Sequence, residues 1–369
     1  MTLARQVATW TAAALASFTT VASAADGAFY GLLRSRDLTP FGFLRLDLRP
    51  AHAVTIEPGS WAIETEIDYQ NTWALSPEVE LYLNGLESQG RRELGADELR
   101  AIRDLPGENY LVDVESSLLD VTLHYKISSQ WTAYVTANAV SYGGGFLDGV
   151  IEDFHDTFGM ASFGRPALSR NDTNIVFDLR SSQVAVFEAP TRGGLIDPTV
   201  GVRYVGIGLP EGWTLALEAA SKVPIRDSSF LLSTGRTDYG LQAALQRFGN
   251  RDAFYVNAAA VYYAGASPPV PQESQIVPTL VVGYERQLSA NTNLNLQGYY
   301  SESVYSRATT NLESLLDDKY QLSIGLRHRM DQFLLTFGFT ENLQNFNNTP
   351  DISFQLGLAW VPRPRSTSG

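Results

Sequence analysis

The stretch DISFQLGLAW at residues 351–360 alternates between polar or small side chains and apolar ones. Its apolar members, which all fall on one face, are Ile352, Phe354, Leu356, Leu358 and Trp360. A period of two residues is that of a β-strand whose two faces meet different surroundings. Strands of membrane barrels have such an apolar face, and aromatic rings gather at its ends, where hydrocarbon meets headgroups. The stretch therefore predicts a strand of a membrane barrel.

The same pattern recurs along the chain, where strands open on an aromatic residue after a short polar turn. The turns at 128–130, 209–212, 249–252 and 330–332 are followed by such residues, and only the turn at 289–293 is followed by an aliphatic one, Leu294. These positions predict an aromatic girdle at one end of the barrel, formed by Trp61, Trp131, Trp213, Phe254, Phe333 and Trp360.

Counting the alternating segments gives an all-β, antiparallel, up-and-down transmembrane barrel over residues 59–360. We expect fourteen strands, or twelve if the weakly patterned pair at 174–180 and 183–188 lies outside the wall. Both counts are even, as in single-chain bacterial barrels, and short turns alternate with long loops in step with them. The short turns share a side with both termini, which is the periplasmic side in such proteins.

The first residues predict export. Residues 1–6 carry one arginine, residues 7–16 are largely apolar, and Ala22-Ser23-Ala24 resembles a cleavage site, so residues 1–24 are expected to be a signal peptide. No later run reaches the ~18–20 apolar residues of a membrane-spanning helix, so any crossing must be made by strands. We therefore expect a bacterial outer-membrane location, with outer-membrane lipids and the barrel assembly machinery as partners and a short tail at 361–369.

Residues 25–58 show neither strand nor helix periodicity and are expected to form an irregular lead-in or plug. This segment contains three prolines and the basic residues Arg34, Arg36, Arg45 and Arg49. The first strand after it puts Glu64, Glu66 and Asp68 on the polar face, toward the lumen. These carboxylates either favour cations or pair with the arginines of the lead-in.

Composition excludes several classes of function. A net charge of −13 disfavours nucleic acid as a partner. The chain has no cysteine, which excludes disulfides and thiolate metal sites. Phosphate-binding and dinucleotide motifs are absent as well, and we expect no cofactor.

Residues 147–158 predict an amphipathic helix inside a long loop. Its apolar stripe comprises Leu147, Val150, Ile151, Phe154 and Phe158. Polar residues of this region that could line or narrow the lumen are Asp148, Glu152, His155, Asp156 and Arg165. Glu152 and His155 are spaced to share a metal, but the other histidines lie in unrelated segments, so we expect no metal site and assign no catalytic residue.

Several short motifs resemble a known family. They are GGGFLD at 143–148, IEDFHD at 151–156, FG at 158–159, TENL at 340–343 and PDISF at 350–354. Together they resemble domain of unknown function family 3187, over about residues 30–360. The resemblance implies a barrel protein of the Gram-negative outer membrane and implies no activity.

Three functions remain open from the sequence. The first is a narrow or plugged channel or transporter for a small solute or a hydrophobic compound. The second is an outer-membrane enzyme acting on lipid, for which His124 with Ser128 or Ser129 offers thin support. The third is a surface structural or adhesion barrel.

Overall fold

A computed structural model describes residues 29–39, 42–50, 56–179, 184–187, 193–266, 271–344 and 348–362. The expected signal peptide and most of the expected tail lie outside the described residues. None of the described helices has the length and apolar character needed to cross a membrane.

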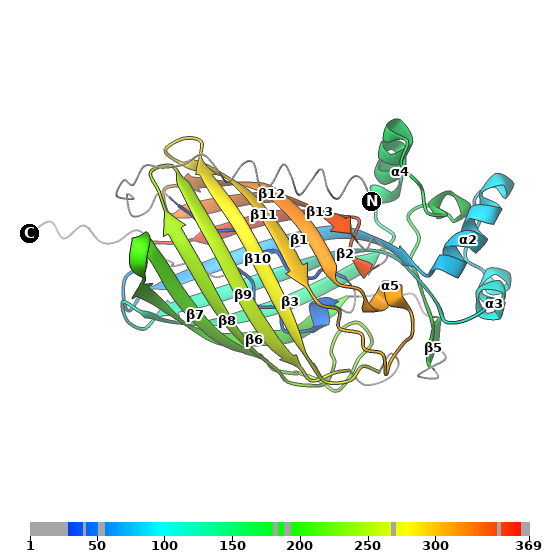
Figure 1. Cartoon of the computed structure of the whole chain (residues 1–369), viewed down its shortest axis with the longest axis horizontal. Coiled ribbons are helices and arrows are strands. Elements are labelled where there is room, and N and C mark those ends of the chain that lie inside the picture. The colour runs from blue at the N-terminus through cyan, green and yellow to red at the C-terminus, as the bar shows by residue number, and fades with distance from the viewer. Residues whose placement is uncertain are drawn as a thin grey trace, which may run out of the picture.

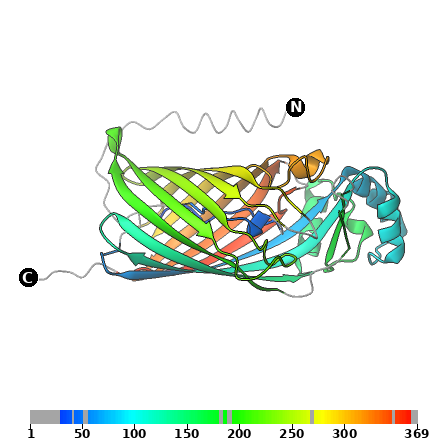
Figure 2. The same cartoon turned by 90° about the horizontal axis from the view of Figure 1, so that it is seen from below.

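Twelve antiparallel strands form a closed ring (Figures 1 and 2). They are β1 (Trp61–Leu75), β2 (Asn109–Lys126), β3 (Trp131–Gly143), β6 (Gly194–Gly208), β7 (Trp213–Lys222), β8 (Asp238–Phe248), β9 (Asp252–Tyr263), β10 (Gln275–Gln287), β11 (Thr292–Ser301), β12 (Lys319–Met330), β13 (Phe333–Gln344) and β14 (Ile352–Trp360). The ring closes because β1 pairs with β2 on one side and with β14 on the other, so that Ile63 lies opposite both Leu123 and Trp360. Closure gives every wall strand a partner on both sides.

The remaining two strands are a hairpin outside the ring. β4 (Asn174–Leu179) pairs with the first residues of β2, Asn109–Asp113, and β5 (Val184–Phe187) pairs with β4. These β2 residues extend beyond the point where β3 ends, at Gly143, and so offer β4 a free edge. The expected count of fourteen strands in the wall is therefore wrong and the alternative of twelve is correct. Periodicity identified the extra pair as strands but carried no information about their partners.

The outer surface of the wall is apolar. Residues of alternating strand positions are exposed there, among them Ile67, Leu356 and Phe337, while their chain neighbours face inward and are polar or small. The expected girdle residues lie at the end of the short turns, where Trp61 packs against Tyr125 and Trp131 against Tyr204. This surface suits lipid, and the fold is that of an outer-membrane barrel.

The helices gather at the opposite end, with the long loops (Figures 1 and 2). The helices of this loop end are α2 (Pro77–Leu86), η2 (Glu87–Gln89), α3 (Ala96–Asp104), α4 (Leu147–Phe158), η3 (Arg165–Ala167) and α5 (Glu313–Leu316), whereas η1 (Gly42–Leu44) lies in the lumen and η4 (Pro210–Gly212) in a short turn. α4 has the bounds that its apolar periodicity predicts. It ends at Gly159, whose left-handed backbone (φ 64°) caps the helix.

Candidate functional site

The described residues 29–39 and 42–50, hereafter the lumenal segment, run inside the barrel. The backbone N–H groups of Tyr30 and Gly31 donate to the carboxylate of Glu285 at 2.8 and 3.0 Å. That of Leu33 donates to the Gln297 side chain at 2.9 Å. Because the segment pairs with no strand, these inward-facing side chains satisfy backbone groups that would otherwise be buried without partners. In Figure 1 the segment is the dark blue chain enclosed by the strands.

Leucines of the lumenal segment pack over glycines of the wall. A Cβ atom added to Gly283 would approach a terminal carbon of Leu32 to 2.3 Å. One added to Gly325 would approach Leu33 to 2.9 Å, and Gly240 gives the same close fit to Leu48 at 2.7 Å. Glycine in a strand interior often marks a close approach by another part of the chain. The wall is therefore shaped to fit this segment.

Buried ion pairs join the same segment to β1 and β2. Arg36 donates to Asp120 at 3.1 Å, and Arg49 lies 2.8 Å from Asp120 and 3.2 Å from Glu66. Arg34 contacts Glu64, which also lies 3.3 Å from the His124 ring. The first-strand carboxylates thus meet arginines of the lead-in, one of the two roles left open by the sequence. Asp68 differs, because it accepts a hydrogen bond from Gln355 at 3.2 Å.

Glu66, Asp68 and Asp120 form a compact buried cluster whose ligand atoms lie within 4.8 Å of one another. Such a cluster has the composition of a divalent-cation site. Here the guanidinium groups of Arg49 and Arg36 contact two of the three carboxylates and supply the countercharge. The lumenal segment therefore neutralises Glu66 and Asp120, while Asp68 is bound by Gln355.

The tip of the lumenal segment closes the loop end of the lumen with apolar contacts. Leu38, Phe43 and Leu44 belong to a buried cluster that includes β4 and the loops before β8 and β12. The Lys319 ammonium lies 2.6 Å from Asp37 beside this cluster, and both side chains are fully buried. Under the loops the lumen is thus filled largely by apolar side chains, with this ion pair beside them.

A small cavity remains between the lumenal segment and β3, β6 and β7. Its volume open to water is about 30 Å³, which holds about one or two water molecules. Its lining includes the ion pair of Arg203 with Glu218 (2.7 Å), and Tyr134 donates to Glu218 at 2.5 Å.

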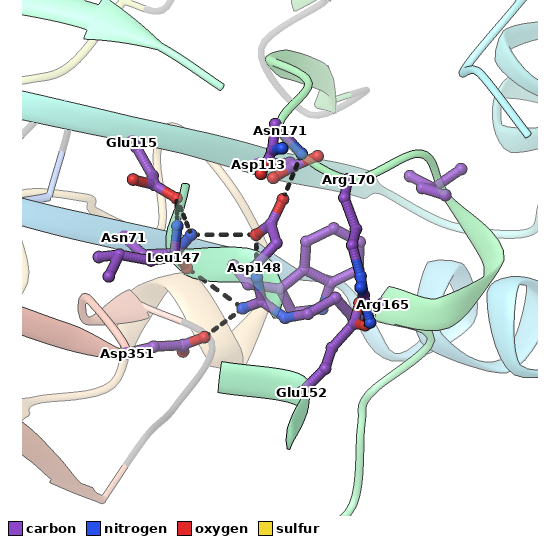
Figure 3. A network of polar contacts seen from close by, with 12 residues as sticks. Asn71, Asp113, Glu115, Leu147, Asp148, Glu152, Arg165, Arg170, Asn171 and Asp351 are labelled. Atoms are coloured by element: carbon purple, nitrogen blue, oxygen red, sulfur yellow. Dashed lines mark hydrogen bonds and ion pairs between the residues drawn. The ribbon is translucent and has the colours of Figure 1, made fainter. Parts of the chain in front are cut away.

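A second polar network lies at the loop end, on the outer face of the wall (Figure 3). On β1, Gln70 faces inward and bonds Ser116, so its neighbour Asn71, opposite Glu115, faces outward. Arg165 is buried against this face, with its guanidinium 2.7 Å from Asp148 and 3.2 Å from Asn71.

The same guanidinium contacts Asp351 and lies 4.8 Å from the ring centre of Trp73. Burial raises the pKa of Asp351 to about 6, an effect that Arg165 opposes and that Asp148 on the same guanidinium reinforces. The two carboxylates of Asp148 and Asp351 therefore share the guanidinium of Arg165.

The start of α4 is held by this network. Glu115 accepts hydrogen bonds from the N–H groups of Phe146 and Leu147 at 3.1 and 2.6 Å. These are among the N–H groups that a helix leaves without internal partners. Gly145 has a positive φ of 63°, and a Cβ there would lie 1.8 Å from the Glu115 carboxylate. The GGG sequence before the helix allows this close approach.

The residues that the sequence assigned to the lumen near the helix are not found there. Asp148, Glu152 and Arg165 come together on the outer face of β1 and β2, where Glu152 binds Arg170 at 2.8 Å and also contacts Arg91. His155 is half-buried and Asp156 is exposed, both on α4 outside the barrel. The network lies outside the barrel because the odd-numbered residues of β1 point away from the lumen. They face lipid toward the short turns and face this network at the loop end. Burial and Arg165 lower the pKa of His155.

The histidine and serine considered for lipid chemistry do not meet. His124 is buried and faces the lumen, beside Glu64 and the ring of Tyr134. The Ser128 hydroxyl instead accepts the N–H of Trp131 in a short turn. On the outer face, His328 bonds the Thr292 hydroxyl at 2.9 Å. These contacts do not bring a histidine and a serine of this pair together.

Comparison with known families adds to this description. The model of a family described as "Protein of unknown function (DUF3187)" matches residues 106–361, more than half of the chain. The chain belongs to the DUF3187 family. The match begins later than the resemblance expected from about residue 30. It contains both Arg165 and Asp351, and the segments near residues 143–159 and 350–354 that carried the resemblance meet in one network. No match was found among curated proteins.

Several solved structures are similar to this DUF3187 protein. The COG4313 outer membrane channel from Pseudomonas putida F1 is 11% identical, with a TM-score of 0.52 over 85% of this chain and 99% of that one. The NanC porin is 9% identical, with a TM-score of 0.40 over 82% and 99%. Outer membrane phospholipase A from Escherichia coli is 10% identical, with a TM-score of 0.35 over 81% and 92%.

Proposed function

We propose that this protein is an outer-membrane conduit for a small hydrophilic solute, held closed by its own N-terminal segment. One observation carries the proposal, namely that the twelve-stranded ring completes its backbone pairing without the lumenal segment. The described part of the segment makes no strand pairing with the wall and is bound there by the wall's side chains, so its displacement would leave the wall intact. In this proposal the loop end is extracellular and the short turns are periplasmic. Export by residues 1–24 and insertion by the barrel assembly machinery remain predictions.

The polarity of the lumen supports a hydrophilic solute over a hydrophobic one. Toward the short turns the inward side chains include carboxylates, amides and bases, such as Glu285, Asn295 and Arg327, beside apolar ones such as Tyr255 and Leu334. Leu32 and Leu33 belong to the lumenal segment and pack against glycines, whereas Leu334 belongs to the wall. A wall cleared of the segment would therefore offer many polar groups to a permeating solute.

Charge supports a preference for cations once the segment is displaced. Glu64, Glu66 and Asp120 would then lose the arginines that contact them. Rings and clusters of carboxylates of this kind favour cations in channels. The segment's arginines would move with it and would no longer neutralise this part of the wall.

Planar-bilayer recordings test the proposal. The mature chain should show no steady conductance, whereas a variant lacking residues 29–50 should give a cation-selective one. A heat-dependent gel shift would verify that both proteins contain a folded barrel. A folded deletion variant that stays silent would contradict the proposal, as would a mature chain that conducts as well as the deletion.

A further inference from the structure

α4 exposes a ridge of large apolar side chains. Phe146, just before the helix, and Val150, Phe154 and Phe158 follow one another at four-residue steps, with 50–64% of each side chain exposed. Residues four apart lie on the same side of a helix. The predicted stripe is thus divided, because Leu147 and Ile151 are buried against the loop end while the ridge contacts little of the protein. An exposed ridge of this kind marks an interaction surface.

The ridge begins on the lipid-facing side of the wall. Phe146 stacks on Tyr69, with ring centres 5.2 Å apart and planes within 14°. Tyr69 shares the outward face of β1 with the girdle residue Trp61, eight residues earlier. At ~3.3 Å per residue and a tilt of ~35–45°, these two residues are about 20 Å apart along the barrel axis. That is close to the ~25 Å height of the apolar band of such barrels, so Tyr69 lies near its upper edge.

Neighbouring strands carry aromatic residues at the same level. Phe354, opposite Tyr69 in the sheet, packs against Phe339 of β13, with ring centres 5.6 Å apart. Tyr69, Phe354 and Phe339 therefore form part of a second aromatic belt, at the loop end. Such belts lie where hydrocarbon meets headgroups. The ridge on α4 is continuous with this belt through Phe146.

The direction of α4 also fits a membrane interface. Figure 1 shows α4 standing crosswise to the long axis of the barrel at the loop end and reaching past the outline of the strands. A helix crosswise to the barrel axis lies along the plane of the membrane. The Arg165 network fixes its first turn, because Asp148 on the helix binds Arg165 and accepts the N–H of Asn171 at 2.8 Å.

We propose that α4 is an interfacial anchor, whose ridge of Phe146, Val150, Phe154 and Phe158 lies in the headgroup and acyl boundary of the leaflet at the loop end. Lipid is the occupant because the ridge continues the lipid-facing belt and the helix lies along the membrane plane. Amphipathic helices bury such a face ~5–10 Å into that boundary. The exposed polar residues Asp153 and Asp156 are acidic, so attraction to anionic headgroups does not recruit the helix. Attachment through Arg165 holds it there instead, whether or not the lumen conducts.

Site-directed spin labelling tests this anchor cleanly, because the chain contains no cysteine. Phe154→Cys places a label on the ridge, and Asp156→Cys is the matched control two residues along the same helix. Leu335→Cys on the outer wall gives a lipid reference, and Leu81→Cys on α2 gives an exposed reference at the loop end. Each labelled protein is reconstituted into phosphatidylcholine vesicles, and a folded barrel is verified by its heat-dependent gel shift.

The measurement is the accessibility of each label to oxygen, which concentrates in lipid, relative to a nickel chelate, which stays in water. The ratio at position 154 should be several-fold above that at 156 and should approach that at 335. A ratio at 154 equal to those at 156 and 81 would show that the ridge faces water and would overturn the proposal. Spin–spin broadening at 154, removed by dilution with unlabelled protein, would also overturn it, because the ridge would then contact a second copy of the chain.

Discussion

Asp120→Asn is expected to loosen the lumenal segment without damaging the wall. Asp120 is 1% exposed and accepts from both Arg36 (3.1 Å) and Arg49 (2.8 Å). Removing one partner of a buried ion pair costs about 3–5 kcal/mol. Arg49 keeps Glu66 and Arg36 keeps the Phe43 carbonyl, so we take the lower value, about 3 kcal/mol. At 1.4 kcal/mol for each factor of ten, the displaced population should rise on the order of a hundredfold.

Thiol labelling measures that population directly. Ser35→Cys introduces one thiol into a buried position of the lumenal segment in a chain that has no other. Its rate of reaction with a bulky maleimide should rise on the order of a hundredfold when Asp120→Asn is added, if the segment opens and recloses quickly relative to labelling. Asp97→Asn, which removes an exposed pair with Arg100 on α3, is the matched control and should not change the rate. Rates within twofold of each other for all three proteins would refute the view that these ion pairs hold the segment.

Four further outcomes are expected. Gly283→Val should also speed the labelling of Ser35→Cys, because its Cβ would meet Leu32, and adding Leu32→Ala should restore part of the protection. Arg165→Met should raise the rate of hydrogen exchange in α4 and leave that of the strands unchanged, because Asp148 stays buried without its cation. Arg100→Met is the control, and unchanged exchange in α4 would contradict the role of Arg165. Protection of α4 against hydrogen exchange should be greater at pH 5 than at pH 7, and Asp351→Asn should abolish this difference. The pKa of Asp351 is raised to about 6, so its stabilising contribution is lost as the pH rises through that value. An identical pH dependence in both proteins would contradict this. Folded protein should migrate differently on denaturing gels before and after heating, and failure to do so would count against the barrel.

The wall could be predicted because its strands are defined by local patterning. Lipid on one side and polar groups on the other impose a period of two, which reads directly from segments such as residues 351–360. The helix at 147–158 could likewise be predicted from the spacing of its apolar residues. The sequence could not predict which strands join the ring. Residues 174–179 have the same local pattern as a wall strand, and their pairing with β2 depends on where β3 ends.

The sites depended on contacts between distant segments. Asp148 and Asp351 were visible in separate motifs and Arg165 as a polar residue after the helix. Their meeting on the outer face requires knowing that β1 and β2 extend beyond the lipid-facing band. Asp120 was missed, since one inward carboxylate resembles any solvated wall residue. A usable signal did exist for the lumenal segment, because inward-facing glycines recur at Gly240, Gly283, Gly325 and Gly338. Such positions indicate that something packs closely against the wall.

The most direct test of closure by the lumenal segment is to lock it in place. The hydroxyl oxygens of Ser35 and Ser323 lie 3.1 Å apart, so Ser35→Cys with Ser323→Cys should form a disulfide between the segment and β12. In the Asp120→Asn background, single-channel recordings should show openings under reducing conditions and none once the disulfide forms, with recovery on reduction. Openings that persist unchanged in protein shown by mass to be fully crosslinked would contradict the central claim that this segment closes the barrel.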